Sequence, residues 1–134
     1  LSFHGIPQDY VDAGDPYATQ CYRTAALLVQ ALGLPEDRWQ LSFQSRLGPK
    51  QWLQPYTDHT LKSLAEEGVK NIQVICPGFS VDCLETLEEV SMENRDIFLE
   101  AGGEQYGYIP CLNDDAAHIH LFSELVSQHT QGWD

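Results

Sequence analysis

Basic residues are scarce in this sequence. Its 134 residues include 7 Lys and Arg against 20 Asp and Glu, which gives a formal net charge of -13 at pH 7. Such a surface repels phosphate backbones, and the few basic residues are scattered, so the composition argues against nucleic-acid binding. A negative field concentrates cations, although an acidic balance is also ordinary for a cytosolic protein.

Long apolar runs and paired cysteines are also missing. No stretch approaches the roughly 20 apolar residues of a membrane span, and no basic amphipathic helix suits anionic lipid. The opening Leu1-Ser2-Phe3-His4 has no initiator Met or charged leader, which predicts a trimmed strand rather than a secretory signal. The cysteines form no C-x-x-C pair, which argues against zinc-ribbon and thioredoxin patterns and favours reduced thiols in the cytoplasm. They are Cys21, Cys76, Cys83 and Cys111.

What is present is an alternation of strand and helix signals. Strands are predicted at residues 1–4, 39–44, 72–76 and 106–109, and helices at residues 16–32, 58–67, 82–99 and 113–130. Caps are expected at Asp15 for the first helix and at Asn113 or Asp114 for the last. We therefore expect an α/β fold, a three-layer sandwich in which a four-stranded parallel sheet is flanked by helices. The sequence has no internal repeat, which argues against a solenoid. It also has no G-x-G-x-x-G loop after a strand, which argues against a nucleotide-binding fold.

Three segments follow predicted strands and should share one rim of the sheet. Ligands of such sheets lie beyond the carboxyl ends of the strands, where His4, residues 45–55 and residues 77–82 occur. His4 precedes Gly5 and Pro7, as expected of a rim residue, and an imidazole there can exchange protons or bind a metal. A loop histidine bonded to backbone is the alternative.

The acidic helix, predicted at residues 82–99, is the second candidate feature. Asp82 and Glu85 fit a capping box, which explains both residues locally. Glu89 and Glu93 continue the same face at four-residue spacing, with Glu88 beside them, although like charges at this spacing destabilise an isolated helix. The face is either an ordinary solvated one or a carboxylate ladder that attracts and passes a divalent cation.

Two loop aromatics complete the predicted rim. Trp52 lies in the loop of residues 45–55, and Phe79 lies just before the acidic helix. Aromatics at a rim suit a flat conjugated ligand, although Phe79 could equally cover the edge of the sheet.

Several unusual strings occur in a characteristic order and resemble the carboxyl-terminal half of the ferrochelatase family, in particular its Gram-negative bacterial members. They are Ser2-Phe3-His4-Gly5-Ile6-Pro7, Gly14-Asp15-Pro16-Tyr17, Gln44-Ser45-Arg46-Leu47-Gly48, Trp52-Leu53 with Pro55, Pro77-Gly78-Phe79, and Asp82-Cys83-Leu84-Glu85-Thr86-Leu87-Glu88-Glu89.

The resemblance implies a lyase that inserts ferrous iron into protoporphyrin IX to form protohaem, the last step of haem biosynthesis. It assigns catalytic roles to His4 and Glu85, and porphyrin binding to Trp52 and Phe79. It implies metal contacts for His4, Glu85, Glu89, Glu93 and Asp82, with a π-type widening in the acidic helix. His4 would accept a pyrrole proton while Glu85 orders the metal; the reverse, with His4 as first ligand, stays open.

The resemblance also implies what else the protein contains and needs. Iron is a substrate, which Zn2+ or Co2+ can replace, and no prosthetic group is expected. Relatives with an iron–sulfur cluster carry a cysteine-rich tail, so none is predicted here. Cys83 stands where some relatives have His, and no ligand role is assigned to it.

The likeness covers one lobe only. Residues 1–134 would be the carboxyl-terminal lobe without the first one, toward which the helix at residues 113–130 would pack, so this piece alone should be inactive or weakly active. A cytoplasmic location with peripheral membrane contact is expected. The alternatives are a cobalt or sirohydrochlorin chelatase, and a non-catalytic metal- or tetrapyrrole-binding domain.

Overall fold

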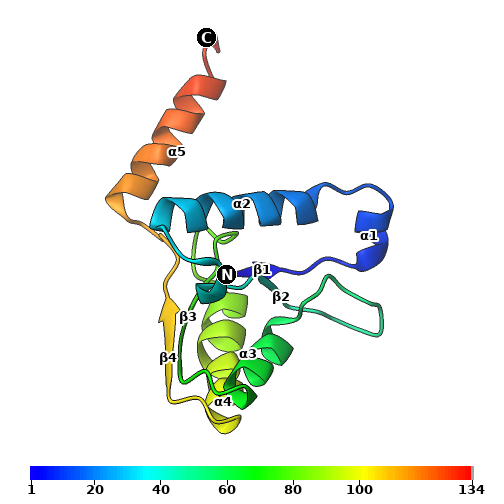
Figure 1. Cartoon of the computed structure of the whole chain (residues 1–134). Helices are drawn as coiled ribbons and strands as arrows, with labels where there is room; N and C mark the ends of the chain where they lie inside the picture. The colour runs from blue at the N-terminus through cyan, green and yellow to red at the C-terminus, as the bar shows by residue number, and fades with distance from the viewer. Residues whose placement is uncertain (134) are drawn as a thin grey trace.

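A computed structural model describes residues 1–133 of the chain (Figure 1). Helices alternate with short strands, as the sequence predicts. The elements are β1 (Ser2–His4), α1 (Gln8–Asp12), α2 (Tyr17–Leu32), the 3-10 turn η1 (Glu36–Arg38), β2 (Ser42–Gln44), α3 (Thr57–Glu66), β3 (Asn71–Ile75), the π-helix η2 (Glu85–Glu93), α4 (Asn94–Glu100), β4 (Gln105–Ile109) and α5 (Ala116–His129).

The strands form two parallel pairs rather than one sheet. β1 pairs with β2, placing His4 opposite Gln44, and β3 pairs with β4, placing Ile75 opposite Ile109. The α/β class and the parallel pairing are confirmed, but the expected four-stranded sheet is wrong, because no backbone ladder joins the two pairs within residues 1–133. β1 and β2 are three residues long, and side chains connect the pairs instead. One such contact runs from the Cys76 thiol to Gln44 Oε1 at 3.4 Å.

Each pair of strands has its own hydrophobic core. In the first, Ala18, Cys21 and Ala25 recur at helical spacing on α2 and pack against Phe3 and Phe43. In Figure 1, α2 crosses the molecule above β1 and β2. This core holds β1 in place, and with it the backbone that carries His4.

The C-terminal end of α2 follows the sequence prediction, whereas the N-cap lies one residue later than expected, at Pro16 rather than Asp15. The Asp15 side chain still contacts the start of the helix, because the Tyr17 N–H donates to Asp15 Oδ1 at 2.8 Å. Gly33 ends the helix with a φ of 64°, a left-handed conformation that glycine adopts without strain.

The second core lies between α3, β3 and the acidic helix. Leu61, Val74, Val90 and Phe98 are buried there, with Phe98 fully enclosed. Gly103 lies against the Phe98 ring so closely that a Cβ at this position would overlap it.

Gly103→Ala should therefore destabilise the full-length protein by about 1–3 kcal/mol, because a methyl group forces the enclosed ring from its place. Thermal unfolding followed by calorimetry should show a lower midpoint. Phe98→Leu in the same background should recover part of the loss, since it makes room for the methyl group. An unchanged midpoint in Gly103→Ala would show that the ring moves without penalty.

The last helix leads away from both cores (Figure 1). Its cap is Asp115, whose Oδ1 accepts from the Ala117 N–H at 2.8 Å, so the expected cap at Asn113 or Asp114 is wrong. Several of its apolar side chains are exposed: Ile119, Leu121, Phe122, Leu125 and Val126. Within residues 1–133, none of the helices combines the length and the apolar character needed to cross a bilayer.

Candidate functional site

His4 lies close to two aromatic rings. Its ring centroid is 6.4 Å from that of Trp52 and 6.3 Å from that of Phe79. The three residues come from the end of β1, the loop after β2 and the turn after β3, so the predicted rim is formed. An imidazole flanked by two aromatic rings can meet a flat ligand edge-on or face-on.

The hydrogen bonds of His4 define which ring nitrogen is available. Nδ1 lies 2.6 Å from the carbonyl oxygen of Gly5, and a carbonyl oxygen only accepts. The neutral ring therefore carries its proton on Nδ1 and keeps a lone pair on Nε2. The Tyr17 hydroxyl donates to the His4 carbonyl oxygen at 2.8 Å and fixes the backbone beneath the ring. Nε2 can accept a proton or bind a metal.

Gly5 allows Trp52 to approach the strand pair. A Cβ on Gly5 would lie 3.0 Å from the Gln44 carbonyl oxygen and 3.3 Å from Trp52 Cε3. Both separations are tighter than ordinary contact, so a larger residue would push the indole away from His4. The close packing against Gln44 and Trp52 therefore explains why a glycine follows His4.

Asp82 does not form the expected capping box with Glu85. Its Oδ1 accepts from the Tyr108 hydroxyl at 2.7 Å and from the Thr86 hydroxyl at 3.0 Å, and its Oδ2 accepts from Asn113 Nδ2 at 2.7 Å. Thr86 accepts the Cys83 N–H at 2.9 Å in the place predicted for Glu85. The prediction failed because Tyr108 and Asn113 are distant in sequence and their hydrogen bonds turn Asp82 toward β4.

These contacts keep Asp82 ionised. Burial alone would raise the pKa of its carboxyl, but the hydrogen bonds from Asn113, Tyr108 and Thr86 outweigh burial and lower that pKa well below its usual range. The carboxylate ties the start of the acidic helix to β4 and to the turn before α5.

Asp82→Asn should destabilise the full-length protein by about 1–3 kcal/mol, because the new amide group faces the donor Nδ2 of Asn113. The pKa of Asp82 is 3.8 in the unfolded chain and lower in the folded protein. The stabilisation by Asp82 is therefore complete above pH 3.8 and is lost progressively as the pH falls from there toward the folded-state pKa. Urea unfolding at pH 7 and at pH 3 should show a smaller difference between variant and wild type at pH 3. An equal difference at both pH values would contradict the ionised role.

Glu85 is the first carboxylate of the π-helix. Its Oε2 accepts from the Cys83 thiol at 3.0 Å. The thiol and the backbone hydrogen bond lower the pKa of Glu85, and nearby His4 adds a smaller lowering effect. The carboxylate is ionised and half-buried on the side of the acidic helix near His4.

The predicted π-type widening is confirmed over Glu85–Glu93. This stretch carries an open hollow of about 270 Å³, lined by Leu84, Glu85, Glu88, Glu89 and Glu93. The carboxylates of the predicted ladder thus share one concave surface, as oxygen ligands for a divalent cation would. In the part of the chain that the structure describes, no three His, Cys, Asp or Glu side chains converge into a metal cage.

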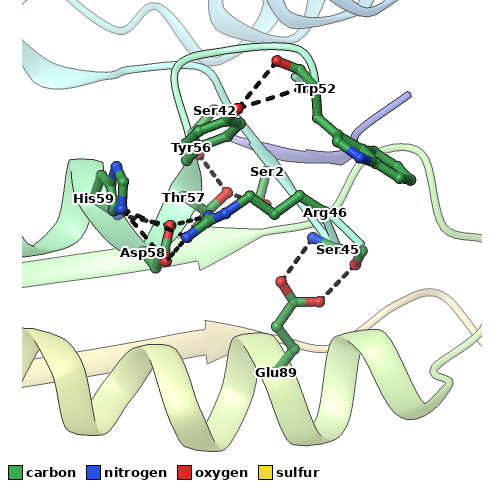
Figure 2. Close-up of polar contacts among 10 residues, drawn as sticks. All are labelled: Ser2, Ser42, Ser45, Arg46, Trp52, Tyr56, Thr57, Asp58, His59 and Glu89. Carbon is green, nitrogen blue, oxygen red and sulfur yellow. Dashed lines mark hydrogen bonds and ion pairs between the residues drawn. The ribbon is translucent and has the colours of Figure 1, made fainter. Parts of the chain in front are cut away.

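Glu89 is fastened to the loop after β2 (Figure 2). Its two carboxylate oxygens accept from the Ser45 N–H at 2.7 Å and from the Ser45 hydroxyl at 2.5 Å. Ser45 has a φ of 67°, in the left-handed region that residues other than glycine seldom adopt. The sequence pointed to Glu89 but gave no sign of its partner.

Arg46 anchors the same loop on its other side. Its guanidinium donates to both oxygens of Asp58 at 2.7 Å and lies 4.4 Å from the centroid of the Tyr56 ring (Figure 2). Burial alone would raise the pKa of Asp58, but Arg46 lowers it. Sequence analysis missed this pair, although opposite charges at the two ends of a predicted loop are a usable signal.

The cysteines remain free thiols. Cys21 and Cys76 are buried, whereas Cys83 and Cys111 are half-buried. Burial raises the pKa of Cys76 to about 12, so this thiol is protonated and inert near neutral pH.

Comparisons with known proteins agree with this arrangement. The ferrochelatase family model matches residues 1–130. The ferrochelatase of Nitrosococcus oceani is 59% identical over 133 residues, 99% of this chain and 36% of the relative. Those of Pseudoalteromonas atlantica and Klebsiella pneumoniae are 55% and 58% identical over 134 and 129 residues, 100% and 96% of this chain. The chain covers 37% and 40% of these two relatives, so it spans well under half the length of all three.

Proposed function

This chain belongs to the ferrochelatase family, and from that premise we propose that the full-length protein inserts ferrous iron into protoporphyrin IX. The product is protohaem, and the reaction is that of a lyase in haem biosynthesis. The observation that supports this most is the placement of His4 beside Trp52 and Phe79. The backbone hydrogen bond of the His4 ring is made by Nδ1, so Nε2 is left for the substrate.

Insertion sets three chemical requirements. Two pyrrole N–H protons must leave, the metal must shed water, and the flat macrocycle must bend to expose its nitrogens. Aromatic and apolar walls can hold a macrocycle bent by using the binding energy of its periphery. Trp52 and Phe79, which both lie close to the His4 ring, supply such walls.

We assign the proton transfer to His4 and the metal delivery to Glu85. The neutral imidazole accepts one pyrrole proton on Nε2, because Nδ1–H is already engaged with the Gly5 carbonyl oxygen. It releases this proton to water and then accepts the second pyrrole proton on the same nitrogen. The ionised Glu85 orders the ferrous ion, which reaches it along Glu89 and Glu93 in the hollow of the acidic helix. Asp82 supports this path by holding the start of the helix.

Metal selectivity should be loose. Nitrogen and oxygen donors bind first-row divalent ions largely in order of intrinsic affinity. Zn2+ and Co2+ should therefore replace iron in the reaction, and the metal is a substrate in each case. We propose no resident prosthetic group and no iron–sulfur cluster for this protein.

The remaining part of the protein should supply the opposite wall of the cleft. The relatives are more than twice the length of this chain, and the apolar side chains of α5 are exposed here. We propose that α5 packs toward that missing first lobe, because an apolar helix face of this kind is ordinarily covered. A cytoplasmic location, with peripheral membrane contact to collect the apolar substrate, completes the proposal.

The test is a metal-insertion assay on the full-length protein. Protoporphyrin IX and sirohydrochlorin are each offered with Fe2+, Zn2+ or Co2+, and the metallated product is followed by its absorbance. The proposal expects metallation of protoporphyrin IX. Metallation of sirohydrochlorin alone would indicate the related chelatase, and binding without metallation would indicate a non-catalytic domain.

A further inference from the structure

We propose that Glu89 is a positioning residue that fastens the Trp52 loop (residues 45–55) onto the acidic helix. Through this contact it supports porphyrin binding as well as the metal path. The inference rests on the proposed function, since it concerns the same cleft. Ser45 and Glu89 together hold the loop in place, a role that neither the sequence pattern nor the hollow lined by glutamates suggests on its own.

The contact between Glu89 and Ser45 is two-pronged. The Ser45 N–H and hydroxyl donate to different oxygens of one carboxylate, at 2.7 Å and 2.5 Å. Hydrogen bonds to an ionised acceptor are roughly twice as strong as those between neutral groups. Because Ser45 has a φ of 67°, the two bonds also hold a backbone conformation that serine seldom adopts. Loss of the carboxylate therefore frees the first residue of the loop.

The loop transmits this position to Trp52. The indole Nε1–H donates to the Leu47 carbonyl oxygen at 2.9 Å, and Leu47 lies two residues beyond Ser45. Arg46, between them, is held by both oxygens of Asp58. Ser45 and Arg46 thus support the two positions that precede the Leu47 carbonyl group, and loss of the Ser45 contact removes one of these two supports from the indole beside His4.

Glu89 can hold the loop and still face a cation. A carboxylate has about four acceptor positions, of which Ser45 occupies two. Glu89 also lines the acidic hollow, next to Glu85 and Glu93. Glu93 shares the hollow but makes no side-chain hydrogen bond or ion pair to residues 1–133. Glu93→Gln is therefore the matched control for Glu89→Gln, because it removes the same charge from the same helix without removing a contact to the loop.

The experiment compares four variants of the full-length protein with the wild type. These are Glu89→Gln, Ser45→Ala, the double variant, and Glu93→Gln. The dissociation constant of protoporphyrin is measured by quenching of tryptophan fluorescence, and the KM for Zn2+ by an insertion assay. Because the binding measurement needs no turnover, it tests the contact independently of the proposed reaction.

We expect Glu89→Gln and Ser45→Ala each to weaken protoporphyrin binding about tenfold, as loss of a charge-assisted hydrogen bond implies. The double variant should be little worse than either single one, because both remove the same contact. Glu93→Gln should raise the KM for Zn2+ and leave protoporphyrin binding unchanged.

Unchanged protoporphyrin binding in Glu89→Gln and Ser45→Ala would overturn the inference, as would purely additive losses in the double variant. Circular dichroism verifies that each variant is folded, and Glu89→Gln keeps one acceptor oxygen so that a folded form is retained. Failure of the wild type to insert Zn2+ would contradict the proposed function, while the binding series would still decide the role of Glu89.

Discussion

His4→Ala in the full-length protein should reduce the turnover of metal insertion by about 10²–10⁴-fold, the range typical of a lost general base. The centroid of the His4 ring lies 6.4 Å from that of the Trp52 ring and 6.3 Å from that of the Phe79 ring, and Nδ1–H bonded to the Gly5 carbonyl oxygen leaves Nε2 as the basic nitrogen. Protoporphyrin binding should change far less, because the two aromatic walls remain. Turnover is followed by the fluorescence of zinc protoporphyrin.

His120→Ala is the matched control for this prediction. His120 lies on α5, far in sequence from the rim. Even where α5 packs against the first lobe, its loss removes no group from the reacting site, so turnover should stay close to that of the wild type. Added imidazole should restore part of the activity of His4→Ala, because a small base can enter the space that the side chain leaves. Wild-type turnover in His4→Ala would remove His4 from the mechanism.

Glu85→Gln should have the second large effect, a fall of about 100-fold or more in kcat/KM for the metal. The substitution keeps the size of the side chain and an acceptor for the Cys83 thiol, while it removes the charge that orders the ion. The dissociation constant of protoporphyrin should stay within about twofold of wild type, since Glu85 is not one of the aromatic walls.

Glu100→Gln removes the same charge from an exposed position on α4 and should leave the kinetics unchanged. The comparison separates a specific effect of Glu85 from a general loss of negative field. Equal effects of the two substitutions would show that net charge, rather than placement, governs metal delivery. A change confined to the KM for protoporphyrin would also contradict the assignment.

Local patterns predicted the four longer helical segments in their order, but they missed the short helix α1 and the 3-10 turn η1. The apolar spacing of α2 and its Gly33 end follow from residues within a few positions of one another. The residues of the predicted rim also meet, although they follow strands of two separate pairs rather than of one sheet. His4, Trp52 and Phe79 meet there as expected.

The errors arose where distant partners compete with local ones. Asp82 and Glu85 have the spacing of a capping box, but Tyr108 and Asn113 draw Asp82 away and Thr86 takes the reciprocal position. Likewise, strand signals do not reveal whether two strand pairs share a ladder. The short β1 and β2 connect to the second pair through side chains such as Gln44.

The contacts of Ser45 and Arg46 were missed for a related reason. Their partners, Glu89 and Asp58, lie 44 and 12 residues away, and neither spacing belongs to a helical or strand period. The π-helix is a different case. It followed from the family resemblance, because no local propensity distinguishes a widened helix from an α-helix at Glu85–Glu93.

A crystal structure of the full-length protein with bound protoporphyrin tests the central claim most directly. The account predicts that the macrocycle lies against Trp52 and Phe79, with a pyrrole nitrogen within hydrogen-bonding reach of His4 Nε2 and the acidic hollow opening onto the other face. A macrocycle bound away from His4, or one whose nitrogens face neither His4 nor Glu85, would contradict it.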